Sequence, residues 1–487
     1  MAQSTKAAVP SPHVPGATPS RPTRLADLPG PRGFPLIGNA TQLEPRRLHH
    51  VLEDWAAEYG PFFQIRLGPK RVLVVADNLV FGDLLRDRPD AFRRFSPMAD
   101  MIDELGAKGV FSAEGEHWRL QRKLVMRAMT PEVVKHFFPT LIRMTDRLER
   151  RWTEAVAAGR PIDMPRDLKR YSMDVTSALA FGVDVDSLEH DDDPLQADVE
   201  HMFDVMCRRT AMPVPYWRYF KLPIDRRTDA AVARIKEAVA NFIAKARARL
   251  AEHPELRLKP SNMLEAMVAA RDEPGSGFTD DDLTGNVMTI LVAGEDTTAN
   301  TIAWLLYFLA INPGAAAKVV AEADAVVGNA PPDFAALDRL DYLDAAAMEA
   351  IRLKPVAPLL FLEANRPAEV GGVHVDAGTP VWGVMRRTAL DEAHFPEAAA
   401  FRPERWLHGD HVAGHDDPKR KVFGFGAGPR FCPGRYLAMV EIKMAVAMAA
   451  RRFTLELDGD ASSVKEVFNF TMMPGSLPIR LRPRTQG

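Results

Sequence analysis

Apolar residues recur with a helical period through the middle of the chain. From about Met101 to Leu306 the pattern predicts mostly helices: Pro131 starts one of them, and Ala230–Leu250 has apolar positions at helical spacing with Arg and Lys between them. Shorter stretches predict strands. Phe62–Leu67 and Val72–Val75 are rich in aromatic and β-branched residues and are separated by Gly-Pro-Lys-Arg, which indicates a hairpin.

Further strand patterns come late in the chain, near Val370–Val381, at Phe453–Leu457 and at Ile479–Leu481. No internal repeat or long linker separates these segments. We therefore predict one large, mainly α domain with a minor β part over residues 29–487. A flexible, Pro-rich tail is expected over residues 1–28.

Charge and cysteine content exclude several classes of protein. The 62 Lys and Arg nearly balance the 65 Asp and Glu, so charge-driven binding of nucleic acid is not expected. Cys207 and Cys432 are the only cysteines, which excludes a disulfide framework. The first 28 residues lack the continuous apolar core of a signal peptide, and the apolar segment Ile302–Ile311 would be about 15 Å long, half of what a bilayer requires. We therefore expect a cytoplasmic protein without a membrane anchor.

One cysteine has an unusual setting. A Gly-rich stretch from Phe423 leads to Cys432, Pro433 and then the helical pattern Tyr436–Ala450. Pro433 suits the first helical position, which would place Cys432 at the N-cap, where free N–H groups and the helix dipole favour a thiolate. Such a thiolate can serve as a nucleophile or as a metal ligand, and a buried cysteine without a function is the third reading.

The same stretch resembles the haem-binding signature of the cytochromes P450, Phe-x-x-Gly-x-Arg-x-Cys-x-Gly. Phe425, Gly428, Arg430, Cys432 and Gly434 match its fixed positions. The resemblance implies the P450 fold, with a long central helix on one side of a haem and the Cys loop on the other. It also implies haem b (iron protoporphyrin IX) ligated by Cys432, with Phe425 packed over the Cys side and Arg430 in contact with a propionate.

Three further motifs follow the family's order. Trp118 and Arg122 resemble its Trp-x-x-x-Arg helix, which implies contacts with haem propionates. Glu349, Arg352 and Arg405 resemble its Glu-x-x-Arg and Pro-Glu-Arg-Phe segments, a structural network of buried charges behind the haem loop, with Trp406 in place of the usual Phe. One departure is Glu363, which stands where many members have a propionate-binding Arg.

The remaining motif lies within a long predicted helix that begins after Thr279 and ends at Asn312. Its middle, Ala293–Thr298, places two acids, two hydroxyls and a Gly in an apolar helix, a local conflict typical of functional sites. It resembles the family's Ala-Gly-x-Asp/Glu-Thr-Thr oxygen-activation motif. Asp296 is then expected to relay protons and Thr297 to hydrogen-bond dioxygen at the haem or its water, while Glu295 occupies the variable position.

The resemblance implies a soluble, bacterial-type monooxygenase that inserts one atom of O₂ into a hydrophobic substrate such as a lipid, terpenoid or steroid. By analogy, the substrate pocket is expected to include Met101 or Ile102, Ala293, Ala357, Leu359, and residues near Phe470 and Met472. A peroxide-dependent or isomerising enzyme and a non-catalytic haem-binding sensor are the alternatives.

Electrons are expected from NAD(P)H through a separate reductase with a ferredoxin or flavodoxin, because no flavin or dinucleotide fingerprint follows Cys432. The expected docking face for this carrier is basic. It consists of residues on the Trp118 helix and on the helix after Cys432: Arg119, Lys123, Arg127, Arg435 and Lys443.

Overall fold

The structure, a computed structural model, describes residues 22–190, 193–210, 212, 214–328, 333–407 and 421–484. The tail expected over residues 1–28 falls mostly outside these ranges. Within them, Thr23–Arg24 form strand β1, and Leu25–Asp27 form a 3-10 turn, η1. Regular structure therefore begins before residue 29.

Helices make up most of the described chain. They are α1 (Leu48–Tyr59), α2 (Asn78–Arg86), α3 (Ser96–Glu104), α4 (Gly115–Ala128), α5 (Pro131–Ala157), α6 (Met164–Phe181), α7 (Pro194–Thr210), α8 (Pro223–Glu252), α9 (Met263–Asp272), α10 (Asp280–Ile311), α11 (Pro313–Val327), α12 (Asp341–Leu353) and α13 (Arg435–Arg452).

The strands form small sheets. They are β1, β2 (Phe62–Leu67), β3 (Lys70–Val75), β4 (Phe92–Arg94), β5 (Leu359–Ala364), β6 (Ala368–Val370), β7 (Val373–Val375), β8 (Pro380–Val384), β9 (Phe453–Leu457), β10 (Glu466–Asn469), β11 (Thr471–Pro474) and β12 (Ile479–Pro483). The largest sheet has the order β2-β3-β8-β5-β4, a smaller one has the order β1-β7-β6, and β10-β11 and β12-β9 are antiparallel pairs.

The predicted hairpin is confirmed as β2 and β3, which pair in antiparallel register from Phe62 opposite Val75 to Leu67 opposite Lys70. The helices expected at Pro131 and over Ala230–Leu250 are α5 and α8. Strands β1, β4, β5, β10 and β11 were not predicted from the pattern. The mainly α architecture with a minor β part is confirmed.

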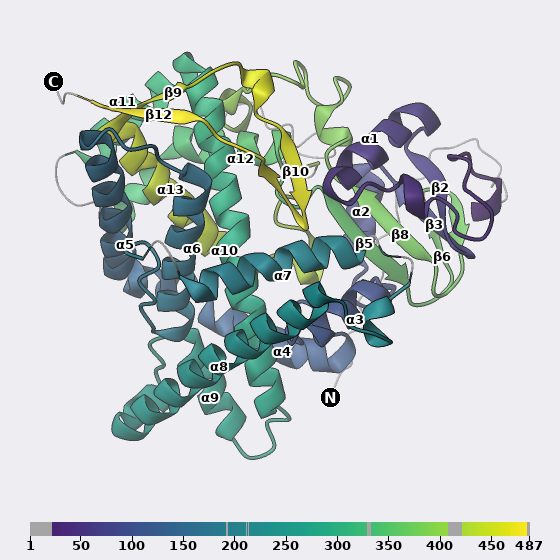
Figure 1. Cartoon of the computed structure of the whole chain (residues 1–487), viewed down its shortest axis with the longest axis horizontal. Helices are drawn as coiled ribbons and strands as arrows, with labels where there is room; N and C mark the ends of the chain where they lie inside the picture. Colours follow the sequence, from purple (N-terminus) through teal and green to yellow (C-terminus); the bar gives the residue numbers. More distant parts are fainter. Residues whose placement is uncertain are drawn as a thin grey trace, which may run out of the picture.

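Helix α10 forms the axis of the helical part. In Figure 1 it runs through the middle of the molecule. Helices α5 and α6 lie on one side of it, and the β2-β3-β8-β5-β4 sheet lies on the other side. Thr279 is its N-cap, as predicted, and the structure adds a capping box: the Asp282 N–H donates to Thr279 Oγ1 at 3.1 Å, and the Thr279 N–H donates to the Asp282 carboxylate at 2.9 Å. The helix ends before Pro313, which cannot continue it.

Helix α6 packs closely against α10 because position 294 has no side chain. A Cβ atom on Gly294 would lie 2.3 Å from Thr176 Oγ1 on α6, a distance that real contacts do not reach. The glycine therefore sets the spacing of these two helices at the middle of α10.

Among the described residues, none of the helices by itself has the length and apolar character needed to cross a bilayer. The pair α10 and α11, bent by 113° at the break between them, meets that test only when taken together.

Candidate active site

The loop before α13 holds Cys432. A 3-10 turn, η10 (Gly428–Arg430), leads into it, and the Cys432 N–H donates to the carbonyl oxygen of Phe425 at 2.8 Å. Helix α13 begins at Arg435 with Gly434 as its N-cap. Cys432 is therefore two residues before the N-cap and not at it, because Pro433 and Gly434 form a turn before the helix starts.

Glycine is required at position 428. Its φ is +65°, and a Cβ atom there would lie 2.3 Å from the carbonyl oxygen of Leu85 and 2.7 Å from Arg86 Cα. The loop can therefore lie directly on the end of α2, which fixes its course toward Cys432.

The surroundings of the Cys432 sulfur act in opposite directions. Burial raises the pKa of the thiol, while the backbone N–H of Gly434 and the charge of Arg122 lower it, and burial has the larger effect. The N–H groups at the helix start therefore favour the thiolate, as expected, but burial opposes them in the protein without metal. A coordinating metal ion deprotonates a cysteine thiol, so the sulfur can still act as a thiolate ligand.

Arg430 lies in a cluster of buried guanidinium groups. Its Nη2 donates to the carbonyl oxygen of Ala113 at 2.6 Å and also to the Glu114 carboxylate, and its guanidinium stacks 4.5 Å from the centre of the Trp118 ring. Within the described part of the chain, the Arg430 Nε has no hydrogen-bond partner. Burial lowers the pKa of Arg430 to about 10.

Two arginines that the sequence analysis missed complete this cluster. Arg88 is 6% exposed, and its Nε and Nη2 have no hydrogen-bond partner among the residues that the structure describes. Arg94 donates from Nε to the carbonyl oxygen of Phe111 at 2.9 Å and lies over the Phe111 ring. Burial lowers the pKa of both groups.

In the described contacts, Glu114 is the one carboxylate near Arg88, Arg94 and Arg430. It forms an ion pair with Arg430, and its Oε1 lies 3.9 Å from Arg88 Nη2. Buried charges without partners are costly, so the cluster carries an excess of positive charge that an anion would relieve. The two propionates of haem fit this excess and the unsatisfied N–H groups. The sequence feature that could have indicated Arg94 is the run Phe92-Arg93-Arg94-Phe95, which places arginines between aromatic residues. It belongs to none of the motifs used in the sequence analysis.

Trp118 and Arg122 on α4 lie beside the loop, and Phe425 is part of it. Trp118 is 5% exposed beneath Arg430. Arg122 donates from Nη2 to the carbonyl oxygen of Phe431 at 2.7 Å, so it holds the residue next to Cys432. Phe425 is half-buried and faces the Arg435 guanidinium, 5.7 Å from its ring centre.

Glu363 lies apart from the arginine cluster. It forms an ion pair with Arg93 and accepts a hydrogen bond from the Ser96 hydroxyl at 3.1 Å. Its charge is balanced locally, between β4 and β5.

The charge network predicted behind the loop is assembled around Glu349. Arg352 donates to both Glu349 oxygens at 2.8 Å, and both residues are fully buried. Arg405 Nε donates to the same carboxylate at 2.9 Å. Trp406 adds an indole donor at 2.8 Å, a contact that the usual Phe could not make.

The middle of α10 is open on one side. Ala293 is exposed and Thr297, one turn later, is half-buried, although the residues on either side of this turn are buried. Thr297 Oγ1 donates to the carbonyl oxygen of Ala293 at 2.9 Å. These two residues therefore face a space that no other described side chain fills.

Asp296 faces the other way and is 2% exposed. Its carboxylate pairs with Lys169 at 3.0 Å, accepts from Asn300 Nδ2 at 2.9 Å and is also bonded by the Thr471 hydroxyl. The structure therefore brings Asp296 and Thr297 onto one turn, but no hydrogen bond joins them among the described contacts. Lys169 and Thr471 were not identified from the sequence.

The expected substrate-lining residues differ in exposure. Ala293 and Ala357 are at least partly open, as is Phe470. Met101, Ile102, Leu359 and Met472 are buried in the apolar core, at 2%, 3%, 6% and 0% exposure.

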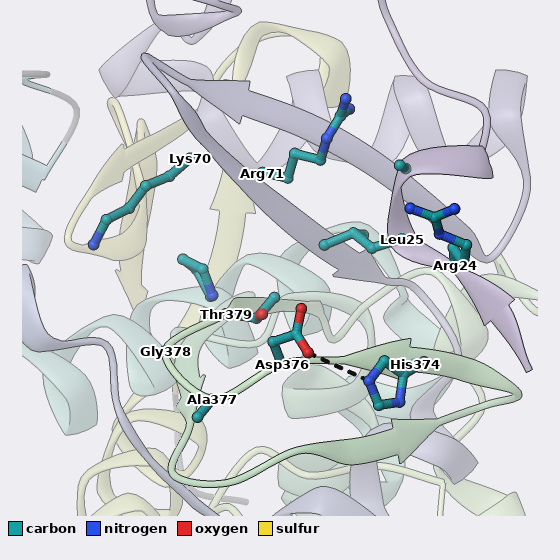
Figure 2. A pocket seen from close by; sticks show the side chains of 11 residues that line it. Arg24, Leu25, Lys70, Arg71, His374, Asp376, Ala377, Gly378 and Thr379 are labelled. Atoms are coloured by element: carbon teal, nitrogen blue, oxygen red, sulfur yellow. Dashed lines mark ion pairs between the residues drawn. The ribbon is translucent and has the colours of Figure 1, made fainter.

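One pocket lies beside the Cys432 loop, and another lies away from it. One, of about 420 Å³, is lined by Met126, Met129, Phe431, Cys432, Arg435 and neighbouring residues, between α4 and α13. The other, of about 360 Å³, lies at the edge of the β1-β7-β6 sheet. Figure 2 shows Asp376 turned toward His374 there, at 3.4 Å, with Arg24, Lys70 and Arg71 around them. It contains none of the predicted site residues.

Comparisons with known proteins agree with this site. A sequence model of the family described as Cytochrome P450 matches residues 28–479. The chain is 27% identical over 421 residues to Protein LUTEIN DEFICIENT 5, chloroplastic, of Arabidopsis thaliana, which covers 84% of this chain and 69% of that protein. It is 26% identical over 426 residues to Carotene epsilon-monooxygenase, chloroplastic, of the same plant, covering 84% and 77%.

A fungal relative is much longer than this chain. The chain is 26% identical over 472 residues to Self-sufficient cytochrome P450 monooxygenase CYP505AG1 of Oidiodendron maius, covering 95% of this chain and 42% of that protein. The chain thus spans less than half of that relative.

The expectation of a cytoplasmic location is contradicted by these matches. The two plant relatives are chloroplastic by name, whereas the expectation rested on the lack of a signal-peptide core and on the short apolar segment Ile302–Ile311.

A family match over most of the chain, a Cys loop with the family's spacing and a buried arginine cluster suited to two propionates lead to one conclusion. The chain belongs to the cytochrome P450 family of haem monooxygenases, with Cys432 as the ligand of the haem iron.

Proposed function

We propose that this monooxygenase oxidises an apolar isoprenoid substrate of the terpenoid or carotenoid class. Haem supplies oxygen activation when bound; the residues of this chain supply the shape and polarity of the site. The observation that carries the proposal is the open side of α10, where Ala293 is exposed and Thr297 presents a single hydroxyl.

The chemistry around this open side favours a hydrophobic ligand. Of the expected lining residues, Ala293 and Ala357 are at least partly open and have no charged groups, so a sugar or nucleotide would lose hydration without gaining partners there. The name of the Arabidopsis carotene monooxygenase supports the isoprenoid class within this range.

Thr297 and Asp296 have different roles in this proposal. The Thr297 hydroxyl is open to the reacting side and can hydrogen-bond dioxygen or water there, while Asp296 supplies protons from the opposite side of α10. A peroxide-dependent enzyme does not need this pair, so the presence of Asp296 and Thr297 argues against a peroxide-driven reaction, which is the second candidate.

Electrons are proposed to come from NAD(P)H through a separate ferredoxin or flavodoxin and its reductase. The other candidate is electron supply without a separate carrier, since the fungal relative is named a self-sufficient monooxygenase. The two are separated by asking whether the chain turns over with NADPH alone.

The test of the substrate class is a titration of the purified haem protein with carotenoids, linear terpenoids, steroids and fatty acids, with a disaccharide as control. The expected result is a change in the Soret band with isoprenoids at the lowest concentration, and an oxygenated product that contains one atom of ¹⁸O from ¹⁸O₂. A response to fatty acids or steroids alone would contradict the isoprenoid class. Product formation with hydrogen peroxide but not with NADPH and a carrier would favour the second candidate.

A further inference from the structure

Imidazole and carboxylate groups meet between the start of α1 and strand β10, away from the Cys432 loop. His49 and His50 are neighbours on α1 with ring centres 4.0 Å apart, and Glu466 belongs to β10. The Nε2 atom of His49 lies 3.0 Å from Glu466 Oε2, and the Nε2 atom of His50 lies 3.2 Å from the same oxygen. Both imidazoles therefore converge on one carboxylate oxygen.

The separations within this cluster are close to those of ligands on one zinc ion. Zinc binds imidazole nitrogen and carboxylate oxygen tetrahedrally at about 2.0–2.1 Å, which places two of its ligand atoms about 3.3–3.4 Å apart. The two imidazoles therefore need only a small outward shift to admit the ion. In the described part of the chain, His49, His50 and Glu466 are the one group of three such residues whose ligand atoms all lie within 4.8 Å of one another.

The second nitrogen of His50 has a carboxylate partner of its own. His50 Nδ1 lies 3.6 Å from Glu53 Oε2, and Arg386 fixes that carboxylate by donating from Nε at 2.9 Å and from Nη2 at 2.6 Å. Histidines that bind a metal through one nitrogen almost always donate the other N–H to a carboxylate, a carbonyl oxygen or water, which orients the ring. His50 has this arrangement, with Nε2 directed at Glu466 and Nδ1 at Glu53.

The two oxygens of Glu466 have different partners. Arg386 Nη1 donates to Oε1 at 2.7 Å, and the Lys354 ammonium bonds the same oxygen. Oε2 faces the two imidazoles. The carboxylate is therefore held through one oxygen while the other is directed at the nitrogen ligands, as in metal sites whose ligating carboxylates are hydrogen-bonded from behind.

The cluster is closed at one end and open at the other. The His49 side chain is fully buried, and its Nδ1 has no hydrogen-bond partner among the described residues, so this nitrogen can take the ring proton without breaking a contact. The His50 side chain is 33% exposed. An ion can therefore enter beside His50, where water can complete the coordination.

We propose that His49 Nε2, His50 Nε2 and Glu466 Oε2 bind a zinc ion, with one water molecule as the fourth ligand, and that this ion joins α1 to β10. Imidazole ligands suit zinc, whereas calcium and magnesium take oxygen ligands. The charges of Lys354 and Arg386 oppose the dication, and those of the two carboxylates attract it. The site is structural and does not depend on the oxygenation proposed above.

The test is zinc binding to the purified haem protein after treatment with a chelator. Calorimetric titration with zinc chloride should show one ion per chain, and X-ray absorption at the zinc edge should show nitrogen and oxygen ligands without sulfur. His50→Ala and Glu466→Gln should each remove this stoichiometric binding. Glu53→Gln should weaken it about 10–100-fold, because His50 loses the group that orients it.

Lys354 supplies a variant with the opposite effect. Lys354→Met removes a cation that competes for Glu466 and should tighten zinc binding several-fold. Zinc should also raise the thermal midpoint of unfolding of the wild type and leave that of His50→Ala unchanged, since a ligand that binds only the folded state stabilises it. A cluster that serves only as a hydrogen-bond network predicts neither result.

Two controls accompany these variants. His374→Ala removes another imidazole that faces a carboxylate, Asp376 at 3.4 Å in the pocket of Figure 2, and should leave the zinc affinity unchanged. Haem content and the CO spectrum of each variant show that the chain is folded.

No stoichiometric zinc in the wild type, sulfur ligands at the zinc edge, or wild-type zinc affinity in folded His50→Ala would overturn the proposal. Failure of the proposed oxygenation would look different, because zinc binding is measured without substrate or reductant.

Discussion

On the central turn of α10, neighbouring side chains have opposite surroundings. Thr297 lies on the open side, whereas Asp296 is buried against α6 and β11. The sequence motif indicated both residues, but it could not show which way each one faces. Their partners Lys169 and Thr471 are 127 positions before Asp296 and 175 after it, and only the fold brings them together.

Replacing Thr297 by Ala tests the open side. Among the described contacts, the hydroxyl donates to the carbonyl oxygen of Ala293 one turn earlier in α10, so its loss should leave haem content and substrate binding nearly unchanged. Oxygen should still be consumed, with more hydrogen peroxide and several-fold less product per NADPH, because the reacting site loses its hydrogen-bond donor. Glu295→Gln is the matched control, since Glu295 lies away from that side. Full coupling in Thr297→Ala would remove the residue from the oxygen chemistry.

Glu441 on α13 predicts a dependence of stability on pH. Burial raises its pKa to about 8, although the Ser172 hydroxyl bound to it acts in the opposite direction. The folded protein thus keeps a proton that the unfolded chain loses at lower pH. Stability from this group is fully present below the unfolded pKa of 4.5 and is lost as the pH rises through about 8.

Urea unfolding as a function of pH checks this. Between about pH 5 and about pH 8, the free energy of unfolding should fall more steeply for the wild type than for Glu441→Gln. Equal slopes for the two proteins would contradict the assignment.

At the scale of elements, α12 and the segment Pro403–Trp406 form one unit around Glu349. Sequence spacing could predict Glu349 and Arg352 on one helix face, since i and i+3 positions are neighbours. The third and fourth partners, Arg405 and Trp406, come from another segment, and only the family resemblance linked Arg405 to them. The helix periods, the N-cap of α10 and the β2–β3 hairpin are local in sequence and could all be predicted.

Two variants of this unit should differ widely in their effect. Glu349→Gln leaves Arg352 and Arg405 buried without a balancing charge, and should destabilise the protein by about 3–5 kcal/mol. Trp406→Phe removes one hydrogen bond and should cost about 1 kcal/mol. Urea unfolding and the yield of haem-bound protein measure both. Similar losses for the two variants would show that the carboxylate does not hold the network.

At the scale of the whole molecule, the Cys432 side carries the basic residues expected to receive an electron carrier. Lys123, Arg127 and Arg435 are exposed there, next to the 420 Å³ pocket. Lys443 is not free, since it pairs with Asp344 at 3.0 Å, and Arg119 pairs with Asp90. The docking face is therefore smaller than the sequence indicated, because local acids occupy two of its five cations.

Charge reversal tests this face. Lys123→Glu with Arg127→Glu should slow reduction by an acidic ferredoxin or flavodoxin at least several-fold at low ionic strength, and the difference should shrink with salt. The matched control is Lys70→Glu with Arg71→Glu in the pocket of Figure 2, which should reduce at the wild-type rate. Equal slowing in both pairs would point to a general effect of net charge.

The strands that escaped prediction share a physical cause. β1 has two residues, β4 three, and β10 and β11 four each, while β5 is buried on most of its length, so none has the alternation that marks an isolated strand. The arginine cluster escaped for a related reason. Arg88, Arg94 and Arg430 are brought together by the loop packing on α2, and no spacing rule joins them.

The central claim is that Cys432 holds the haem iron as a thiolate, and the spectrum of the reduced protein with CO tests it most directly. We predict the strongly red-shifted Soret band of a thiolate-ligated haem in the wild type and in Cys207→Ala, since the Cys207 thiol is already bonded to the carbonyl oxygen of Phe468 at 3.3 Å. Cys432→His should move the band to the position of His-ligated haem proteins. An unchanged band in Cys432→Ala would contradict the account.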